Sequence, residues 1–545
     1  MTKRNVAMLG SATTLCLAMV TAPVAAPDGP AALELANKGE PAVCLFTPLK
    51  DAAAQRAVER WRAFLTVRGW AVKVAPPSAK PDLPPAGAVM AFESADTAPI
   101  AKQVEAELGG LDGARPDAYL LLATNWNGRP LILAVGKTSA GTDCAAARLL
   151  GKVGCWDGKA TIAPCEELAK PFFNVREMML CPRNNYERWK PERLAAYPEF
   201  LKACGFNSVQ IAEILTYWGH NLKRSVVAPA IRTVAKSAHE QGMLVSQFVW
   251  GCELQSGGDD FLKLQATNYA DVVDHLVTHW GDPGNGNYAN SQQITTKLLE
   301  EYRKINPKTR ATVSTWVMHR FWRGNPQAKS FLDETFSPKA IGIALHRWWD
   351  DRGKWGKKGN ENIRWAEKVL KASRRLGIWG WYLGDYEMGG KEHLRTRILN
   401  KYFDSLPDSV STNVDWVSIE KVNHGDLARI NQYVAGQKMW NPHRPLRAIM
   451  MDYCRSMYGP VYAETVCDAF EAVEEIQRQV ITGNIPEWDR FPKVEQDDAW
   501  KARTAGLLTK LEAVKLPADW QPNLADVGSV ANDVERLKAR LSGKK

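Results

Sequence analysis

Short apolar stretches recur at nearly even intervals through the middle of this 545-residue chain. Each stretch has the length of a β-strand, and most are followed by a segment with apolar residues at helical spacing. The stretches begin near Val175, Ser208, Met243, Asp274, Arg310, Ala340, Gly377 and Ser411. Eight β-then-α units of this size are what a (β/α)8 TIM barrel requires, so we predict an α/β fold of that class.

The segments between these stretches predict helices over residues 191–203, 229–241, 291–305, 363–376 and 392–403. Pro229 stands where the first turn of a helix tolerates proline, whereas Pro198 falls inside the first helix and is expected to kink or restart it. Gly205, Gly242 and Gly377 each follow one of the helices. We expect left-handed helix caps at these three glycines.

Two further regions flank the predicted barrel at residues 169–437. Residues 27–168 carry strand-like runs at 42–46, 118–123 and 130–135 and a helix-like run at 52–67, which predicts a small N-terminal α/β domain. Residues 438–545 show helical spacing throughout and predict a C-terminal helical domain.

The N-terminus has the pattern of a secretory signal over residues 1–26. Lys3 and Arg4 precede a short apolar run, and small residues follow at its end. A membrane anchor is the alternative, but the run is short and interrupted by Gly, Ser and Thr. We expect an exported protein, periplasmic or secreted, with no membrane span in the mature chain.

Composition excludes several classes of protein. The net charge of +10 is modest for this length and is compatible with acidic ligands. No zinc-finger, RNA-recognition or helix-turn-helix signature predicts nucleic-acid binding. A GKT triplet resembles part of a phosphate-binding loop, but Leu131 occupies the position of its first glycine, which rejects nucleotide binding. Among the scattered cysteines, Cys144, Cys155 and Cys165 are near enough in sequence for one pair to form a disulfide.

Candidate chemistry begins at the end of the fourth strand, in THWGDPGNGNYAN. Asp282 follows this strand directly after His279 and Trp280, an arrangement that fits a catalytic carboxylate beside an aromatic floor. The alternative is that Asp282 only organises the turn, because Asp-Pro-Gly is a common turn sequence.

The seventh strand ends in WYLGDYEMGG. Asp385 and Glu387 are two residues apart, so an extended backbone places both on one face together with Trp381. Two neighbouring carboxylates raise the pKa of one of them, which suits a general acid. A helix N-cap is the alternative and explains one acidic residue better than two.

Other strand ends add candidates. Trp348 and Asp350 follow the sixth strand, and His319 follows the fifth. Arg176 on the first strand and Glu213 on the second are candidates for substrate binding. Arginine binds planar carboxylates bidentately, so arginines around the mouth would suit an acidic sugar.

Paired carboxylates among 21 tryptophans favour glycoside hydrolysis. That reaction needs one carboxylic acid to protonate the leaving oxygen and a second carboxylate to attack or to activate water. We expect Asp282, Asp385 and Glu387 to do this work, with Asp350 next. The expected partner is a carbohydrate, and no metal or other cofactor is expected. Two alternatives stay open: a non-catalytic glycan-binding protein on a barrel scaffold, and a polysaccharide lyase.

Two segments carry a resemblance to known families. The segment ILAVGKTSAGTDCAAARLLG is similar to the end of the small α/β domain that precedes the barrel in the α-glucuronidase and β-hexosaminidase groups of glycoside hydrolases. The segment QKMWNPHRPLRAIMMDYCRSMYGP resembles the junction after the barrel in α-glucuronidase-like proteins. The resemblance spans residues 118–460 and implies catalytic positions at Asp282, Asp350 and Glu387. It departs from both groups after strand four, where this chain has Asp-Pro and they carry Glu or an adjacent Asp-Glu pair.

Overall fold

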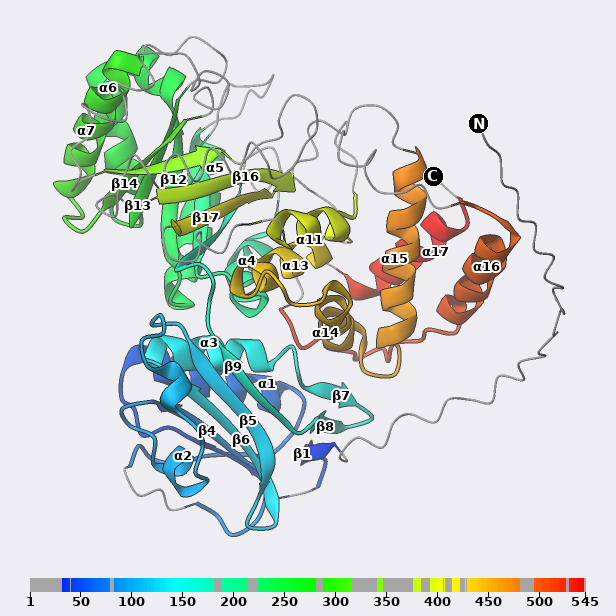
Figure 1. Ribbon diagram of the computed structural model, residues 1–545. Coiled ribbons are helices and arrows are strands. Elements are labelled where there is room, and N and C mark those ends of the chain that lie inside the picture. Colours follow the sequence, from blue (N-terminus) through cyan, green and yellow to red (C-terminus); the bar gives the residue numbers. More distant parts are fainter. Residues whose placement is uncertain are drawn as a thin grey trace, which may run out of the picture.

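The computed structural model places three regions side by side (Figure 1). An N-terminal α/β region and a bundle of C-terminal helices both pack against a central barrel. The structure describes residues 32–39, 41–78, 83–180, 189–213, 224–280, 288–315, 341–346, 376–383, 393–404, 406, 414–421, 427, 429–480, 495–525 and 529–543.

The N-terminal region is a sheet with helices on both faces. Helices α1 (Ala52–Val67) and α3 (Ser139–Leu149) cover one face, and α2 (Pro99–Gln103) covers the other. A separate three-stranded sheet has the order β1 (Leu33–Asn37), β8 (Lys159–Ile162), β7 (Gly154–Trp156). The six strands of the main sheet, in spatial order, are β3 (Val72–Val74), β2 (Val43–Phe46), β4 (Val89–Ser94), β6 (Arg129–Gly136), β5 (Tyr119–Trp126) and β9 (Cys165–Ala169).

The barrel is closed and its eight strands are all parallel, because the last strand pairs with the first. The strands begin at or within a few residues of the predicted positions, which confirms the predicted fold class. Their bounds are β10 (Val175–Leu180), β11 (Ser208–Ala212), β12 (Leu244–Trp250), β13 (His275–Trp280), β14 (Arg310–Thr315), β15 (Ile341–His346), β16 (Leu376–Leu383) and β17 (Val414–Lys421).

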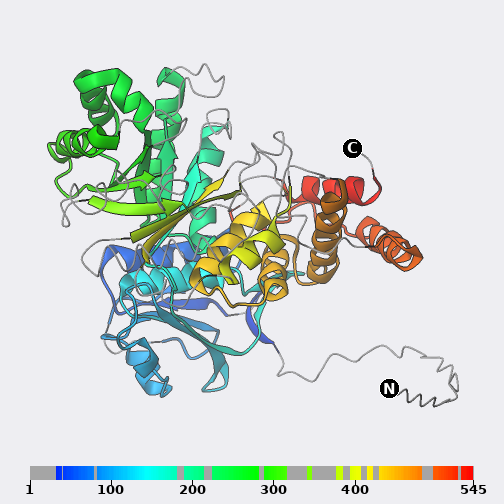
Figure 2. The same cartoon turned by 45° about the horizontal axis from the view of Figure 1, so that its top comes forward.

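Among the described residues, a helix follows each of the first four barrel strands and another follows β16 (Figure 2). Gly205 and Gly242 have φ angles of 108° and 66°, which confirms the predicted left-handed caps. Pro198 lies inside one continuous helix, so the helix does not restart there. Two other expectations were wrong: Pro229 lies inside a helix, and Gly377 lies within β16. The described helices are α4 (Pro191–Cys204), α5 (Arg224–Glu240), α6 (Gly251–Tyr269), α7 (Tyr288–Arg303) and α11 (Thr396–Asp404).

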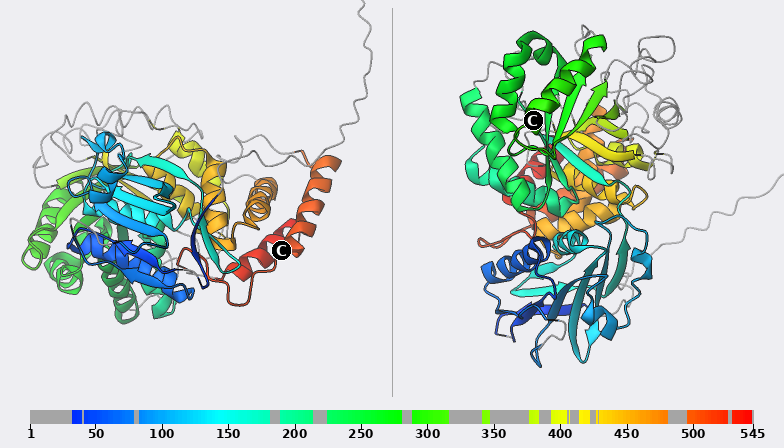
Figure 3. Two further views of the ribbon diagram at one scale, coloured as in Figure 1. Left: turned by 90° about the horizontal axis from the view of Figure 1, so that it is seen from below. Right: turned by 90° about the vertical axis from the view of Figure 1, so that its left-hand side faces the viewer.

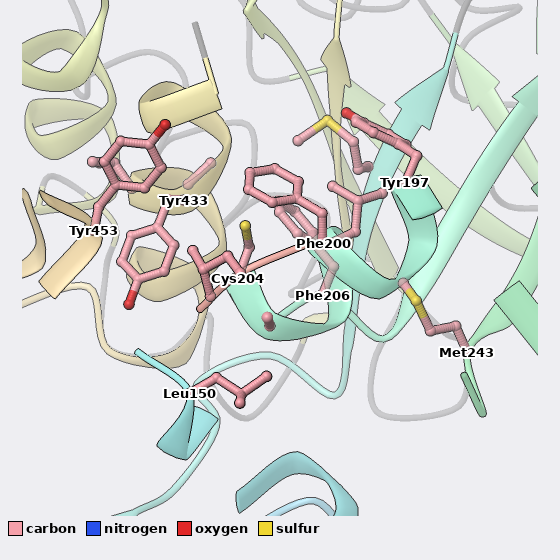
Figure 4. Packing of buried hydrophobic residues seen from close by; sticks show 14 of the residues in the cluster. Leu150, Tyr197, Phe200, Cys204, Phe206, Met243, Tyr433 and Tyr453 are labelled. Atoms are coloured by element: carbon pink, nitrogen blue, oxygen red, sulfur yellow. The ribbon is translucent and has the colours of Figure 1, made fainter. Parts of the chain in front are cut away.

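The C-terminal helices pack on the barrel and on one another (Figure 2). Figure 4 shows the shared core, where Cys204 of α4 lies beside Tyr433, with Leu150 of the N-terminal region below. The approach is so close that a side chain at Gly436 would meet the Cys204 carbonyl. The helices are α13 (Arg429–Trp440), α14 (Leu446–Tyr458), α15 (Ala463–Val480), α16 (Asp498–Glu512) and α17 (Val530–Leu541).

The barrel is stacked on the N-terminal region, as the right view of Figure 3 shows. A buried ion-pair cluster ties the two together. Asp143 of α3 accepts from Arg60 of α1 at 2.6 Å and lies 3.2 Å from the Lys202 ammonium of α4. Burial alone would raise the pKa of Asp143, but Lys202 and Arg60 lower it to about 2. The carboxylate is therefore ionised and joins the two regions.

Two other observations bear on the predictions. Cys144, Cys155 and Cys165 are free thiols, so the expected disulfide among them is absent. In the part of the chain that the structure describes, every helix is too short or too polar to cross a membrane.

Candidate functional site

A buried carboxylate fills the interior of the barrel near the N-terminal ends of its first strands. Glu177 of β10 accepts hydrogen bonds from Ser208 Oγ at 2.8 Å, Gln210 Nε2 at 2.7 Å and Ser246 Oγ at 2.5 Å. Burial raises the pKa of Glu177, and the hydrogen bonds oppose that rise. Because these residues fill the interior between the first three strands, a substrate site in the barrel must lie nearer the C-terminal ends of the strands.

Aromatic side chains form the next interior layer. The Phe248 and Trp250 rings of β12 lie 5.3 Å and 5.1 Å from the His279 ring, centroid to centroid. Burial lowers the pKa of His279 to about 3, so its imidazole is neutral at ordinary pH. The structure thus places this predicted residue inside the barrel close to its mouth, where a neutral ring is suited to hydrogen bonding and cannot supply a positive charge.

Glu213 lies outside the barrel interior, against the surrounding helices. Its carboxylate accepts from Arg224 Nε at 2.6 Å, Gln265 Nε2 at 2.7 Å and Tyr269 Oη at 2.8 Å. It continues the side of β11 that carries Val209 and Ile211, which belong to the core shared with the helices. The prediction that Glu213 contacts substrate directly does not match this position, because its oxygens are occupied by protein donors.

Arg176 is also displaced from its predicted role. Its guanidinium pairs with Asp117 of the N-terminal region at 2.6 Å and donates to the Gly205 and Phe173 carbonyls, both at 2.8 Å. It also stacks over the Trp440 ring at 4.3 Å. Arg176 is the second residue of β10, so it lies at the end of the barrel opposite the mouth, fully buried. It joins the regions and does not orient a sugar.

One titratable group at the mouth was missed from the sequence. Glu253 lies in the first turn of α6, immediately after β12 ends at Trp250. Burial, with added repulsion from the Glu213 carboxylate, raises the pKa of Glu253 to about 7. The signal in the sequence is an acidic residue three positions beyond the end of a strand.

The other predicted site residues have no described side-chain contacts. Trp280 lies on β13 and Trp381 on β16, and the structure describes only the backbone of these two residues. Among the described residues, no group of His, Cys, Asp and Glu side chains is arranged to hold a metal ion. Outside the described residues lie Asp282, His319, Trp348, Asp350, Asp385 and Glu387.

The strand directions still bear on those carboxylates. All eight strands are parallel, so the ends of β13, β15 and β16 open on the same side of the barrel. In the sequence, Asp282 follows the end of β13, Asp350 that of β15, and Asp385 that of β16. The fold therefore directs the C-terminal ends of these three strands to one side of the barrel, the side on which TIM-barrel active sites lie.

Comparisons with known proteins agree with this architecture. Searches with family models and among curated proteins found no match. Among solved structures, CpGH84B is similar over 92% of this chain and 85% of its own, with 13% identity and a TM-score of 0.57. The family GH115 4-O-methyl-α-glucuronidase BtGH115A, specific for decorated arabinogalactans, is similar over 93% and 73%, with 13% identity and a TM-score of 0.56.

A third solved structure is a GH138 enzyme that targets pectin rhamnogalacturonan II. It is similar over 92% of this chain and 68% of its own, with 10% identity and a TM-score of 0.54. At such identities the likeness concerns the fold. The chain has the fold of TIM-barrel glycoside hydrolases, and the remote resemblance expected from the sequence is confirmed.

Proposed function

We propose that the protein is an exported glycoside hydrolase that cleaves glycosidic bonds in a poly- or oligosaccharide. The observation that carries this proposal is the closed parallel barrel, with the fold of glycoside hydrolases, whose strand ends are followed in sequence by acidic residues. Export rests on the signal-like pattern of residues 1–26.

The proposed chemistry is carboxylate acid/base catalysis. One of Asp282, Asp385 and Glu387 donates a proton to the leaving oxygen, and another attacks the sugar or activates water. Asp350 is the next candidate. Tryptophans near the strand ends would stack on the apolar faces of sugar rings, and His319 would orient the bound sugar.

We further propose an acidic, uronic-acid-containing glycan as substrate. The net charge of +10 supports an anionic ligand. BtGH115A, one of the similar structures, is described as a glucuronidase, which supports the same class. Arg224, the first residue of α5, offers a cation beyond the C-terminal end of β11; Glu213 holds it through Nε and leaves its two other nitrogens without a hydrogen-bond partner among the described residues.

The test is substitution of a catalytic carboxylate. Glu387→Gln keeps the size of the side chain and removes its ionisation, so turnover should fall by at least about a hundredfold while the unfolding midpoint stays nearly unchanged. Glu300→Gln is the matched control, because Glu300 is an exposed residue of α7. Full activity in Glu387→Gln would remove Glu387 from the site.

A further inference from the structure

A groove lies away from the barrel mouth, between the β7–β8 hairpin and the segment at residues 517–521. Its volume is about 530 Å³, which is within the range of small-molecule sites in proteins. The hairpin belongs to the N-terminal region, which contacts the barrel at the N-terminal end of β10 through Arg176. A ligand in this groove would therefore not compete with one at the C-terminal ends of the strands.

The wall of the groove is aromatic and held in place. The Trp156 and Trp520 rings lie 5.6 Å apart, and Tyr462 meets Trp156 edge-on at 5.3 Å. The Trp520 indole N–H donates to the Met457 carbonyl at 2.8 Å. Gly459, with φ of 83°, admits both indoles, because a side chain there would come within 2.8 Å of Trp156. Rings fixed before binding cost a ligand little ordering entropy.

The charges around the groove balance. Lys38 is exposed, and Arg68 donates to the Gln521 and Pro522 carbonyls, without a carboxylate partner among the described residues. Asp157 and Asp519 are exposed on the same groove and have no ion-pair partner in the described part of the chain. Lys159 also lines the groove and pairs with Glu34 at 3.0 Å. Apart from that pair, two cations face two carboxylates. Such a surface offers both donors and acceptors and shows no preference for an anion.

Another hollow adjoins the groove. A neighbouring hollow of about 620 Å³ shares Val67, Arg68 and Gln521 with it. The exposed Val67 side chain adds an apolar surface where the two meet. Two adjoining hollows suit an extended chain better than a single compact molecule.

We infer that this groove is a second glycan-binding site, which holds a neutral stretch of polysaccharide chain. Flat indole surfaces match the C–H faces of pyranose rings, and the surrounding carboxylates and ammonium group match the sugar hydroxyls. The inference extends the proposed function, since a remote site would keep a polymeric substrate near the mouth. Its test does not require cleavage.

The experiment measures binding by calorimetry in intact Glu387→Gln protein, with xylohexaose and cellohexaose as neutral probes and trigalacturonate as the acidic one. Trp156→Ala should weaken binding of at least one neutral probe by about tenfold or more. Trp500→Ala is the matched control, because Trp500 is half-buried on α16 and outside the groove.

A second variant guards against damage to the fold. Asp157→Asn with Asp519→Asn changes only exposed side chains and should weaken the same probe several-fold. Neutral probes that do not bind the parent protein, or that bind Trp156→Ala equally well, would overturn the inference. Cleavage is measured separately, in the protein with Glu387 intact. Cleavage there without Trp156-dependent binding refutes the groove alone, whereas Trp156-dependent binding without cleavage of any glycan by that protein refutes the hydrolase alone.

Discussion

Asp143→Asn is the most direct test of how the barrel is joined to the N-terminal region. The Asp143 side chain is 1% exposed, and the Lys202 ammonium that faces it is 4% exposed. The substitution leaves that ammonium buried without its counter-ion, and it weakens the contact to Arg60. Removing one partner of a buried ion pair is strongly destabilising, because the remaining charge is not compensated.

The expected loss in the free energy of unfolding is about 3 kcal/mol, the lower end for a broken buried pair. The lower end applies because asparagine keeps one acceptor oxygen and Arg60 also donates to Gln241 at 3.0 Å. Replacing Lys202 by Met in the same protein should recover part of the loss, because the buried ammonium that lost its counter-ion is then gone, while Arg60, whose side chain is 7% exposed, still lacks the carboxylate.

The pH dependence follows from the pKa of Asp143, about 2 in the folded protein against an ordinary value of 3.8. A lowered folded-state pKa stabilises the protein above pH 3.8, and the stabilisation is lost as the pH falls through about 2. The difference corresponds to on the order of 2 kcal/mol. Asp143→Asn should lack this part of the acid sensitivity.

The assay is urea unfolding followed by tryptophan fluorescence at neutral and acidic pH. The midpoint should fall for Asp143→Asn. Asp112→Asn is the control, because Asp112 is 85% exposed and its pair with Lys137 at 3.9 Å is at the surface. A loss below about 1 kcal/mol for Asp143→Asn, similar to the control, would refute the argument from a buried ion pair.

Two other substitutions test local features. Gly205→Ala should destabilise the protein by about 1–3 kcal/mol, because φ is 108° and a methyl group would lie 2.6 Å from the Trp440 ring. Gly506→Ala is its counterpart and should stabilise by up to about 1 kcal/mol, since Gly506 is helical with open space around it; chemical denaturation reports both. For Glu253, whose folded-state pKa of about 7 exceeds its ordinary 4.5, unfolding free energy should fall as pH rises through that window. Glu253→Gln should remove that fall. If the pH profile of the unfolding midpoint is the same in Glu253→Gln as in the unsubstituted protein, the raised pKa of Glu253 is contradicted.

The barrel was predictable because its signal is periodic and long. Eight strand-length apolar runs at even spacing exclude most other folds, and the observed strands begin close to the expected residues. Helix boundaries were less predictable: Pro229 is compatible with a first turn, but α5 begins earlier, at Arg224. Gly377 followed a helix-like segment, yet it lies in β16, where a side chain would meet the Trp416 ring of β17.

The candidate site was less predictable because alternation gives two faces and does not say which one is inside. On β11 the apolar residues Val209 and Ile211 face the helices, and the polar Ser208 and Gln210 face Glu177 in the interior. Glu213 shares the apolar face, so it joins the helix layer. Arg176 lies near the N-terminal end of β10, whereas the predicted site is at the C-terminal ends of the strands. Its position in the strand alone therefore argued against a role in substrate binding.

The central claim is that the protein hydrolyses glycosidic bonds. The measurement that tests it most directly is a product screen, in which purified protein is incubated with acidic and neutral glycans. New reducing ends and ultraviolet absorbance are followed together. We predict new reducing ends from at least one uronic-acid-containing glycan, without absorbance. An unsaturated, absorbing product would establish a lyase instead, and the absence of any product across the panel would contradict a hydrolase.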